Sequence, residues 1–277
     1  ICLDESMLIW HEQWMCPGWI FCPCKPHQFG NEYHMACCAL MNILFSIELV
    51  EGKDLPPQVA VDFKEKGKTA GLLLRMLWPF FYTGGFVMLD SGFCILKAII
   101  ELQKVGVYSC ALIKKQKYWP MLVPGEAMQR FFDEEGIEVG GTHAIQGVFE
   151  GTTYNLLGMK EPNNVMQMIV MGGPLGVNDS CWEMKHSWDE GGVMVAHQFR
   201  NICSYDWHFC YRHAVDDHNN LCHSLSLIED SWVMRWWETW VFSFLLAITK
   251  VNAFLCLCYF TFGKGELPGY PKLTIFW

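Results

Sequence analysis

Charged residues are scarce in this sequence, and several common functional signatures are missing. Only 18% of the 277 residues are charged, and 29 acidic side chains outnumber 20 basic ones, which gives a formal net charge of −9. Nucleic-acid-binding domains are usually basic, so charge alone argues against that class, although an acidic enzyme can still bind DNA through local basic patches. The Gly-rich runs match neither a P-loop nor a dinucleotide fingerprint. The sequence therefore gives no sign of a nucleotide-cofactor enzyme.

A secretory signal is also missing. The chain opens with ICLDES and has no basic n-region before an apolar run. We therefore expect its 14 cysteines to be mostly reduced and buried. Structural zinc is not expected, because two groups of potential ligands lack the paired C-x2-C spacing of zinc sites. These groups are Cys16, Cys22 and Cys24, and then His208, His213, His218 and His223 with Cys203, Cys210 and Cys222.

Apolar residues are abundant, and one long run could be mistaken for a membrane span. Hydrophobic residues make up 52% of the chain and aromatic residues 15%, enough for a large core. Residues 240–262 are long enough to cross a bilayer. Lys250 and Asn252 lie near the middle of this run, and a central Lys costs roughly 3 kcal/mol on insertion. The sequence therefore favours a core helix and predicts no membrane partner.

The first 115 residues alternate between strand and helix patterns. Three strands come first, then a helix, a strand, a second helix ending at Gly106, and a last strand. The predicted elements are the strand ICLDES, two strands within 31–54 around a turn near Met41-Asn42, a helix over 67–81, a strand over 84–90, a helix over 95–107 and a strand over 108–115. This order predicts an α/β fold with a mixed sheet and crossover helices, as in a ribonuclease H-like core.

The rest of the chain predicts an insertion followed by helices. Residues 1–115 form the first part of the core. Scattered Gly and Pro with short β-like runs indicate an inserted, β-rich subdomain over 116–210. Helical patterns over 211–262 predict closing helices of the core, and 263–277 is a loop-like tail.

Three acids stand at positions suited to chemistry. Asp4 and Asp90 each close a predicted strand, and Asp216 opens the last helical region. If the two strands are neighbours and the helix crosses their edge, the three carboxylates converge, and they would repel one another without divalent cations between them. Mg²⁺ prefers such oxygen ligands, and two ions would support phosphodiester transfer. The alternative stays open that each acid is a turn residue or a helix cap.

Five segments, in order, resemble the transposase domain of piggyBac-type elements and the proteins derived from them. LDES carries Asp4, LDSGFC carries Asp90 and HAVDDHNN carries Asp216, each matching one catalytic-acid motif. CKPHQFG at 24–30 matches a K-P-x-x-x-G segment through Lys25. RWWETWVFSFLLAITKVNAF at 235–254 is similar to the closing helices of the family. Where the family often has a further acid three residues after the third Asp, this chain has Asn219.

The resemblance implies a ribonuclease H-like fold and a DNA transposase that cuts and joins strands. It implies that Asp4, Asp90 and Asp216 hold two Mg²⁺ or Mn²⁺ ions, with water and then a DNA 3′-OH as nucleophiles. It further implies element ends and TTAA-type targets as DNA partners, a homodimer as the candidate assembly, and the nucleus as the location. A catalytically inactive, transposon-derived remnant that binds DNA or protein is the alternative.

A short basic run completes the candidate sites. KKQK at 114–117 stands beside Tyr118 and Trp119, a combination that can contact phosphates and bases. With Lys25, its Lys114, Lys115 and Lys117 are the candidate DNA-binding residues. A solvated strand end is the alternative reading of this run.

Overall fold

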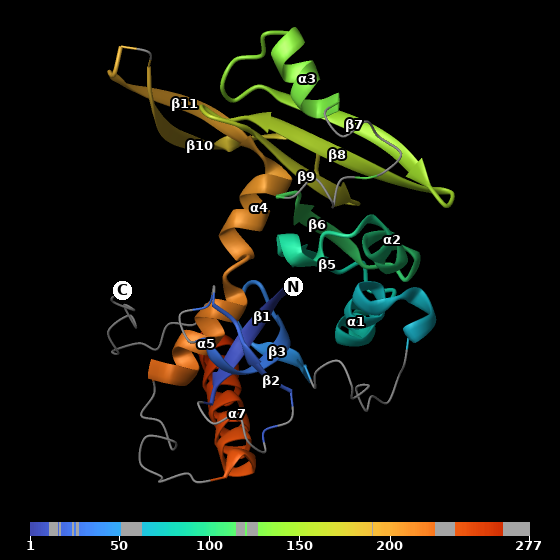
Figure 1. Cartoon of the computed structure of the whole chain (residues 1–277), viewed down its shortest axis with the longest axis vertical. Helices are drawn as coiled ribbons and strands as arrows, with labels where there is room; N and C mark the ends of the chain where they lie inside the picture. Colours follow the sequence, from blue (N-terminus) through green and yellow to red (C-terminus); the bar gives the residue numbers. More distant parts are fainter. Residues whose placement is uncertain are drawn as a thin grey trace. The chain divides into compact units, whose positions relative to one another are not determined.

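The chain forms two compact units. The computed structural model describes residues 1–10, 16, 18–23, 25, 28–50, 63–114, 120, 127–189, 191–224 and 236–262. Unit 1 comprises Ile1–Ala60 with His213–Trp277, and unit 2 comprises Val61–Arg212. Figure 1 colours the chain by sequence, so that unit 1 joins the blue start of the chain to its orange and red end.

An antiparallel sheet organises unit 1. Its central strand, β3, pairs antiparallel with each of the other three. The strands are β1 (Cys2–Ile9), β2 (Trp19–Phe21), β3 (Phe29–Cys37) and β4 (Leu44–Leu49). The predicted turn near Met41-Asn42 is confirmed, because Asn42 lies between β3 and β4 with a φ of 56°. Asn tolerates this left-handed conformation better than most residues.

Two helices, α5 (Ala214–Ser224) and α7 (Trp237–Phe262), pack on one face of this sheet (Figure 1). Side chains alternate between the two faces of a strand. The core cluster accordingly takes its β1 and β3 residues from one face of the sheet and joins them to the two helices. Its strand members include Cys2, Leu8, Tyr33, Met35 and Cys37, and its helix members include Val215, Leu221, Phe244, Ile248 and Val251.

The apolar run at 240–262 forms most of α7. One side of the helix belongs to the core cluster, through Phe244, Ala247 and Val251. Phe242 and Phe260 are among its exposed apolar residues. By length and hydropathy alone the helix could also cross a membrane, although only 33% of its most apolar window is buried inside the fold. The predicted core role is therefore confirmed for one side of the helix.

Unit 2 contains a mixed sheet. β5 and β6 run parallel, joined by the crossover helix α2 (Leu96–Lys104), while β6–β9, β9–β8 and β8–β7 are antiparallel pairs. Its strands are β5 (Phe86–Leu89), β6 (Tyr108–Leu112), β7 (Thr142–Phe149), β8 (Thr152–Lys160) and β9 (Val165–Met171). A separate hairpin pairs β10 (Val177–Trp188) with β11 (Met194–Ile202).

Two helices of unit 2 follow the sequence pattern, and two others lie within 116–210, where the sequence predicts a β-rich subdomain. They are α1 (Lys68–Leu77), α2 (Leu96–Lys104), α3 (Ala127–Glu134) and α4 (Cys203–Tyr211), with short 3-10 turns η1 (Lys64–Lys66), η2 (Trp78–Phe80) and η3 (Ser91–Phe93). α1 ends earlier than the predicted residue 81, because Pro79 continues the chain in η2. α2 stops as expected before Gly106, whose φ of 71° suits glycine.

α3 lies against β8, as Figure 1 shows at the top of unit 2. A Cβ at Gly158 of β8 would come within 2.5 Å of the Met128 sulfur of α3. The missing side chain therefore permits close packing of the helix on the strand. The predicted division into a core, an inserted subdomain over 116–210 and closing helices stays a prediction, and the predicted tail at 263–277 falls outside the described residues.

Candidate active site

Asp4 lies in β1, on the face of the unit 1 sheet that packs against α5 and α7. The alternation of the strand places it with Cys2 and Leu8, which belong to the core cluster on that face. Its carboxylate Oδ1 accepts a hydrogen bond from the Glu5 backbone N–H at 2.8 Å. The acid is half-buried rather than enclosed. One of the three predicted acids thus faces the helix that carries another.

Asp216 stands in the first turn of α5 and is 56% exposed. The backbone N–H of its neighbour Val215 hydrogen-bonds the Cys2 thiol, two residues before Asp4. The N-terminus of α5 therefore lies over β1 beside Asp4. The helix N-terminus favours a carboxylate through its dipole, and the His213 Nδ1 is 3.7 Å from the Asp216 Oδ2. The contact between Val215 and Cys2 brings the first and third predicted acids to one strand–helix junction.

The other polar residues of α5 have distinct environments. Asp217 accepts a hydrogen bond from the Asn42 amide at 3.4 Å. Burial, together with Asp216, outweighs His213 and Asn42 and raises the pKa of Asp217. The side-chain oxygen of Asn219 is buried and has no hydrogen-bond partner among the residues that the structure describes. Asp216 and Asn219 are three residues apart, so they share one side of the helix.

Asp90 follows β5 directly and caps η3. Its carboxylate accepts from the Gly92 backbone N–H at 3.4 Å, and the Lys114 Nζ lies 3.6 Å from its Oδ1. Burial alone would raise the pKa of Asp90, but the Ser91 backbone N–H, Lys114 and Gly92 outweigh it and lower that pKa. The capping role that the sequence left open is therefore present, and it leaves the carboxylate ionised and 44% exposed.

The three acids stand in the two units: Asp4 and Asp216 in unit 1, and Asp90 in unit 2. Their assignment to one metal site stays a prediction. The donor chemistry fits Mg²⁺ or Mn²⁺, because the strand–helix junction offers carboxylate oxygens and the unpartnered amide oxygen of Asn219.

Two of the four candidate DNA-binding lysines lie among the described residues. The Lys25 Nζ donates to the Glu5 carbonyl oxygen at 3.2 Å, so its charge is held against β1. Lys114 is 55% exposed and follows β6. Lys115 and Lys117 fall outside the described residues, as do Tyr118 and Trp119. Contact with DNA stays a prediction for all four lysines.

Two members of the Cys and His groups have hydrogen-bond partners of their own. The buried Cys16 thiol donates to the Asn31 side-chain oxygen at 2.7 Å. His218 is fully buried and its Nδ1 donates to the Asn42 carbonyl at 2.9 Å. Burial lowers the pKa of His218, which keeps it neutral. Cys24 is outside the described residues.

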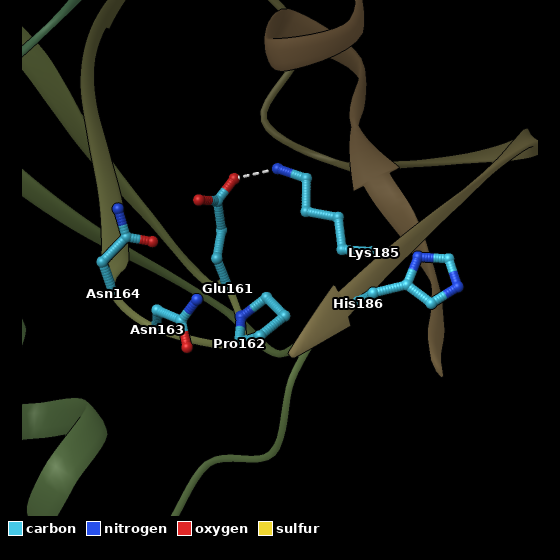
Figure 2. A pocket seen from close by; sticks show the side chains of 6 residues that line it. All are labelled: Glu161, Pro162, Asn163, Asn164, Lys185 and His186. Atoms are coloured by element: carbon cyan, nitrogen blue, oxygen red, sulfur yellow. Dashed lines mark hydrogen bonds and ion pairs between the residues drawn. The ribbon is translucent and has the colours of Figure 1, made fainter. Parts of the chain in front are cut away.

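A pocket of about 480 Å³ opens in unit 2 beside the β8–β9 connection. Figure 2 shows the Lys185 ammonium directed at the Glu161 carboxylate, with Pro162, Asn163, Asn164 and His186 around them. Burial would lower the pKa of Lys185, but Glu161 and Tyr205 outweigh it and raise that pKa. Tyr205 donates to the same Glu161 oxygen at 3.1 Å.

None of the three predicted acids lines this pocket. Sequence reasoning missed it, since its residues come from the β8–β9 connection and from β10 and carry no spacing signal.

Comparisons with known proteins agree with the sequence resemblance. A cryo-EM structure of a piggyBac transposase synaptic complex with hairpin DNA matches 96% of this chain with a TM-score of 0.69 at 15% identity. The match covers 48% of that longer chain. It shows that the fold is ribonuclease H-like, as the strand order predicts. No match was found among curated proteins. The family described as Transposase IS4 matches residues 1–254, so the chain belongs to this transposase family.

Proposed function

We propose that this chain is the catalytic part of a DNA transposase that cuts and joins DNA strands with divalent metal ions. The observation that carries the proposal is the junction of β1 with α5, where the Val215 backbone N–H bonds Cys2 beside Asp4. Asp216, the next residue of the helix, and Asp4 thus belong to one junction in a chain of a transposase family.

Asp4, Asp90 and Asp216 are the proposed ligands. Bound Mg²⁺ or Mn²⁺, two ions in all, would activate a water or a 3′-OH and stabilise the leaving oxygen. The junction carries its acids on a strand and a helix, which hold side chains more rigidly than loops do. Asn219 would add a neutral oxygen on the Asp216 side of α5. The Asp90 carboxylate, kept ionised by Lys114 and the η3 backbone, is ready to bind a cation without losing a proton.

The partners follow from the same family. The solved relative is described in a synaptic complex with hairpin DNA, and we propose element ends with TTAA-type targets as the DNA of this chain. Lys25, Lys114, Lys115 and Lys117 are its proposed DNA contacts. A homodimer and a nuclear location complete the proposal. Because the chain spans about half of that relative, these properties belong to the proposal for the whole protein.

The test is a strand-nicking and strand-transfer assay with Mg²⁺ or Mn²⁺ on DNA that carries the inverted repeats flanking the coding sequence. Wild-type protein should nick this DNA only when metal is present. Asp90→Asn should remove nicking while the melting temperature stays within a few degrees. Nicking that survives Asp90→Asn would refute the assignment of the acids.

Asp133→Asn is the matched control. Asp133 is 57% exposed in α3 and lies 3.8 Å from Lys160, so it is an exposed acid with one lysine partner, like Asp90. The proposal expects this variant to nick DNA at the wild-type rate. Equal loss in both variants would instead indicate a general effect of charge.

A further inference from the structure

Two carboxylates and one imidazole converge on the other face of the unit 1 sheet. Glu5 of β1 stands directly opposite His34 of β3 in the strand register, and Glu32 is two residues before His34. One ligand atom from each of Glu5, Glu32 and His34 lies within 4.8 Å of the other two, and all three residues are half-buried. The strand pairing, rather than chance approach of long side chains, thus brings them together.

This face is distinct from the one that carries Asp4. Tyr33 and Met35 of β3 belong to the core cluster with α5 and α7. Their neighbours Glu32 and His34 therefore project from the opposite face. Glu5 likewise alternates with Asp4 along β1. The group is consequently separate from the predicted catalytic acids, although Glu5 and Asp4 are adjacent in the chain.

The kinds of ligand indicate the kind of ion. Mg²⁺ takes oxygen ligands and keeps several waters. An imidazole nitrogen with two carboxylate oxygens instead suits a first-row transition ion such as Zn²⁺. Three protein ligands with water in the fourth position are common in zinc sites. Two carboxylates at this separation also repel each other, and a divalent cation between them offsets that electrostatic repulsion.

From this geometry we infer that Glu5, Glu32 and His34 form a binding site for one first-row divalent metal ion, of which Zn²⁺ is the best-fitting example. The ion bridges β1 to β3. It fixes Glu5, whose backbone N–H donates a hydrogen bond to the Asp4 carboxylate at 2.8 Å. By linking β1 to β3, the ion supports the strand that carries the first predicted catalytic acid.

Zinc binding to the full chain is measured by equilibrium dialysis after chelator treatment, with elemental analysis of the bound metal. The parent protein and all variants carry Asp216→Asn, which reduces metal binding at the predicted catalytic acids. We expect one Zn²⁺ per chain, and a melting temperature that rises with the zinc concentration because the ion binds the folded state. Glu32→Gln and His34→Gln should each weaken zinc binding by roughly tenfold or more.

Glu48→Gln is the matched control, because Glu48 of β4 is the other strand neighbour of His34 and is also half-buried. Its zinc affinity should stay within about threefold of the parent, well below the roughly 10–100-fold cost of losing even an outer-shell partner. Metal-free Glu32→Gln should melt at the temperature of the metal-free parent; if it does not fold, Glu5→Gln replaces it. Absence of bound zinc, or equal losses in Glu48→Gln and Glu32→Gln, would overturn the site. Neither result bears on metal-dependent nicking, which is assayed separately.

Discussion

The Asn252 side chain of α7 forms both hydrogen bonds that the Leu44 backbone offers at the start of β4. Its oxygen accepts the Leu44 N–H and its nitrogen donates to the Leu44 carbonyl, each at 2.9 Å, across 208 residues of sequence. An Asn in the middle of an apolar helix is costly without partners. Here it satisfies a strand end and fixes α7 to the sheet of unit 1.

Asn252→Leu should therefore destabilise the protein by about 2–3 kcal/mol, since it leaves two backbone groups without partners. The measurement is urea unfolding followed by circular dichroism. Thr249→Val is the control, because the exposed Thr249 hydroxyl donates only to the Leu245 carbonyl in its own helix. If Thr249→Val lowers the free energy of unfolding as much as Asn252→Leu, the loss is not specific to the hydrogen bonds between Asn252 and Leu44.

Asp216 and Asp217 should differ sharply in their effect on catalysis. Asp216 is 56% exposed at the α5–β1 junction, whereas Asp217 is bound to Asn42 at 3.4 Å. Asp216→Asn should reduce nicking by more than the roughly 10–100-fold that loss of an outer-shell partner costs, with the melting temperature unchanged. Asp217→Asn should keep nicking within about tenfold of wild type. The reverse order of the two variants would transfer the third catalytic role to Asp217.

Much of the fold could be predicted because its local signals agree with one another. The turn at Asn42 and the end of α2 at Gly106 both use residues that tolerate a positive φ. The run before Asp90 is apolar and short, as expected of a buried strand. α1 ended early because Pro79 starts η2, a boundary that hydrophobic spacing alone does not reveal.

The site residues were harder to predict for a physical reason. Motif order pointed to Asp4 and Asp216, but only strand–helix packing shows that Val215 bonds Cys2 beside Asp4. His34 and Glu5 are 29 positions apart and meet through antiparallel register alone. No spacing rule identifies such a pair before the register is known.

The proposed function predicts that Lys114 contacts DNA phosphate. It is 55% exposed and lies 3.6 Å from Asp90, so its ammonium is accessible beside a proposed catalytic acid. Lys114→Ala should weaken DNA binding equally for all sequences and reduce the salt-dependence slope by about 1. Fluorescence anisotropy over a series of salt concentrations measures this slope.

Lys97→Ala is the control, because Lys97 is an exposed lysine of α2, and it should leave the slope unchanged. Equal slopes for wild type and Lys114→Ala would remove Lys114 from the DNA contacts.

Glu101 should make the stability of unit 2 depend on acid pH. This buried carboxylate of α2 contacts the Lys66 Nζ at 3.0 Å and the Lys104 Nζ at 2.8 Å. Burial alone would raise the pKa of Glu101, but the two lysines outweigh it and hold that pKa below the ordinary 4.5. A lowered folded-state pKa stabilises the protein above the unfolded-state pKa, and this stabilisation is lost as the pH falls through the folded-state value.

Glu101→Gln should therefore cost about 2–3 kcal/mol of unfolding free energy at neutral pH, because two charge-assisted hydrogen bonds are lost. The difference from wild type should shrink as the pH falls from about 5 to about 3, where protonation removes the same charge from wild type. Urea unfolding at a series of pH values measures this difference. Glu65→Gln, at an exposed position in η1, should show little change at any pH. A Glu101→Gln deficit that stays constant across this range would mean that packing, rather than the ion pairs with Lys66 and Lys104, sets the contribution of Glu101.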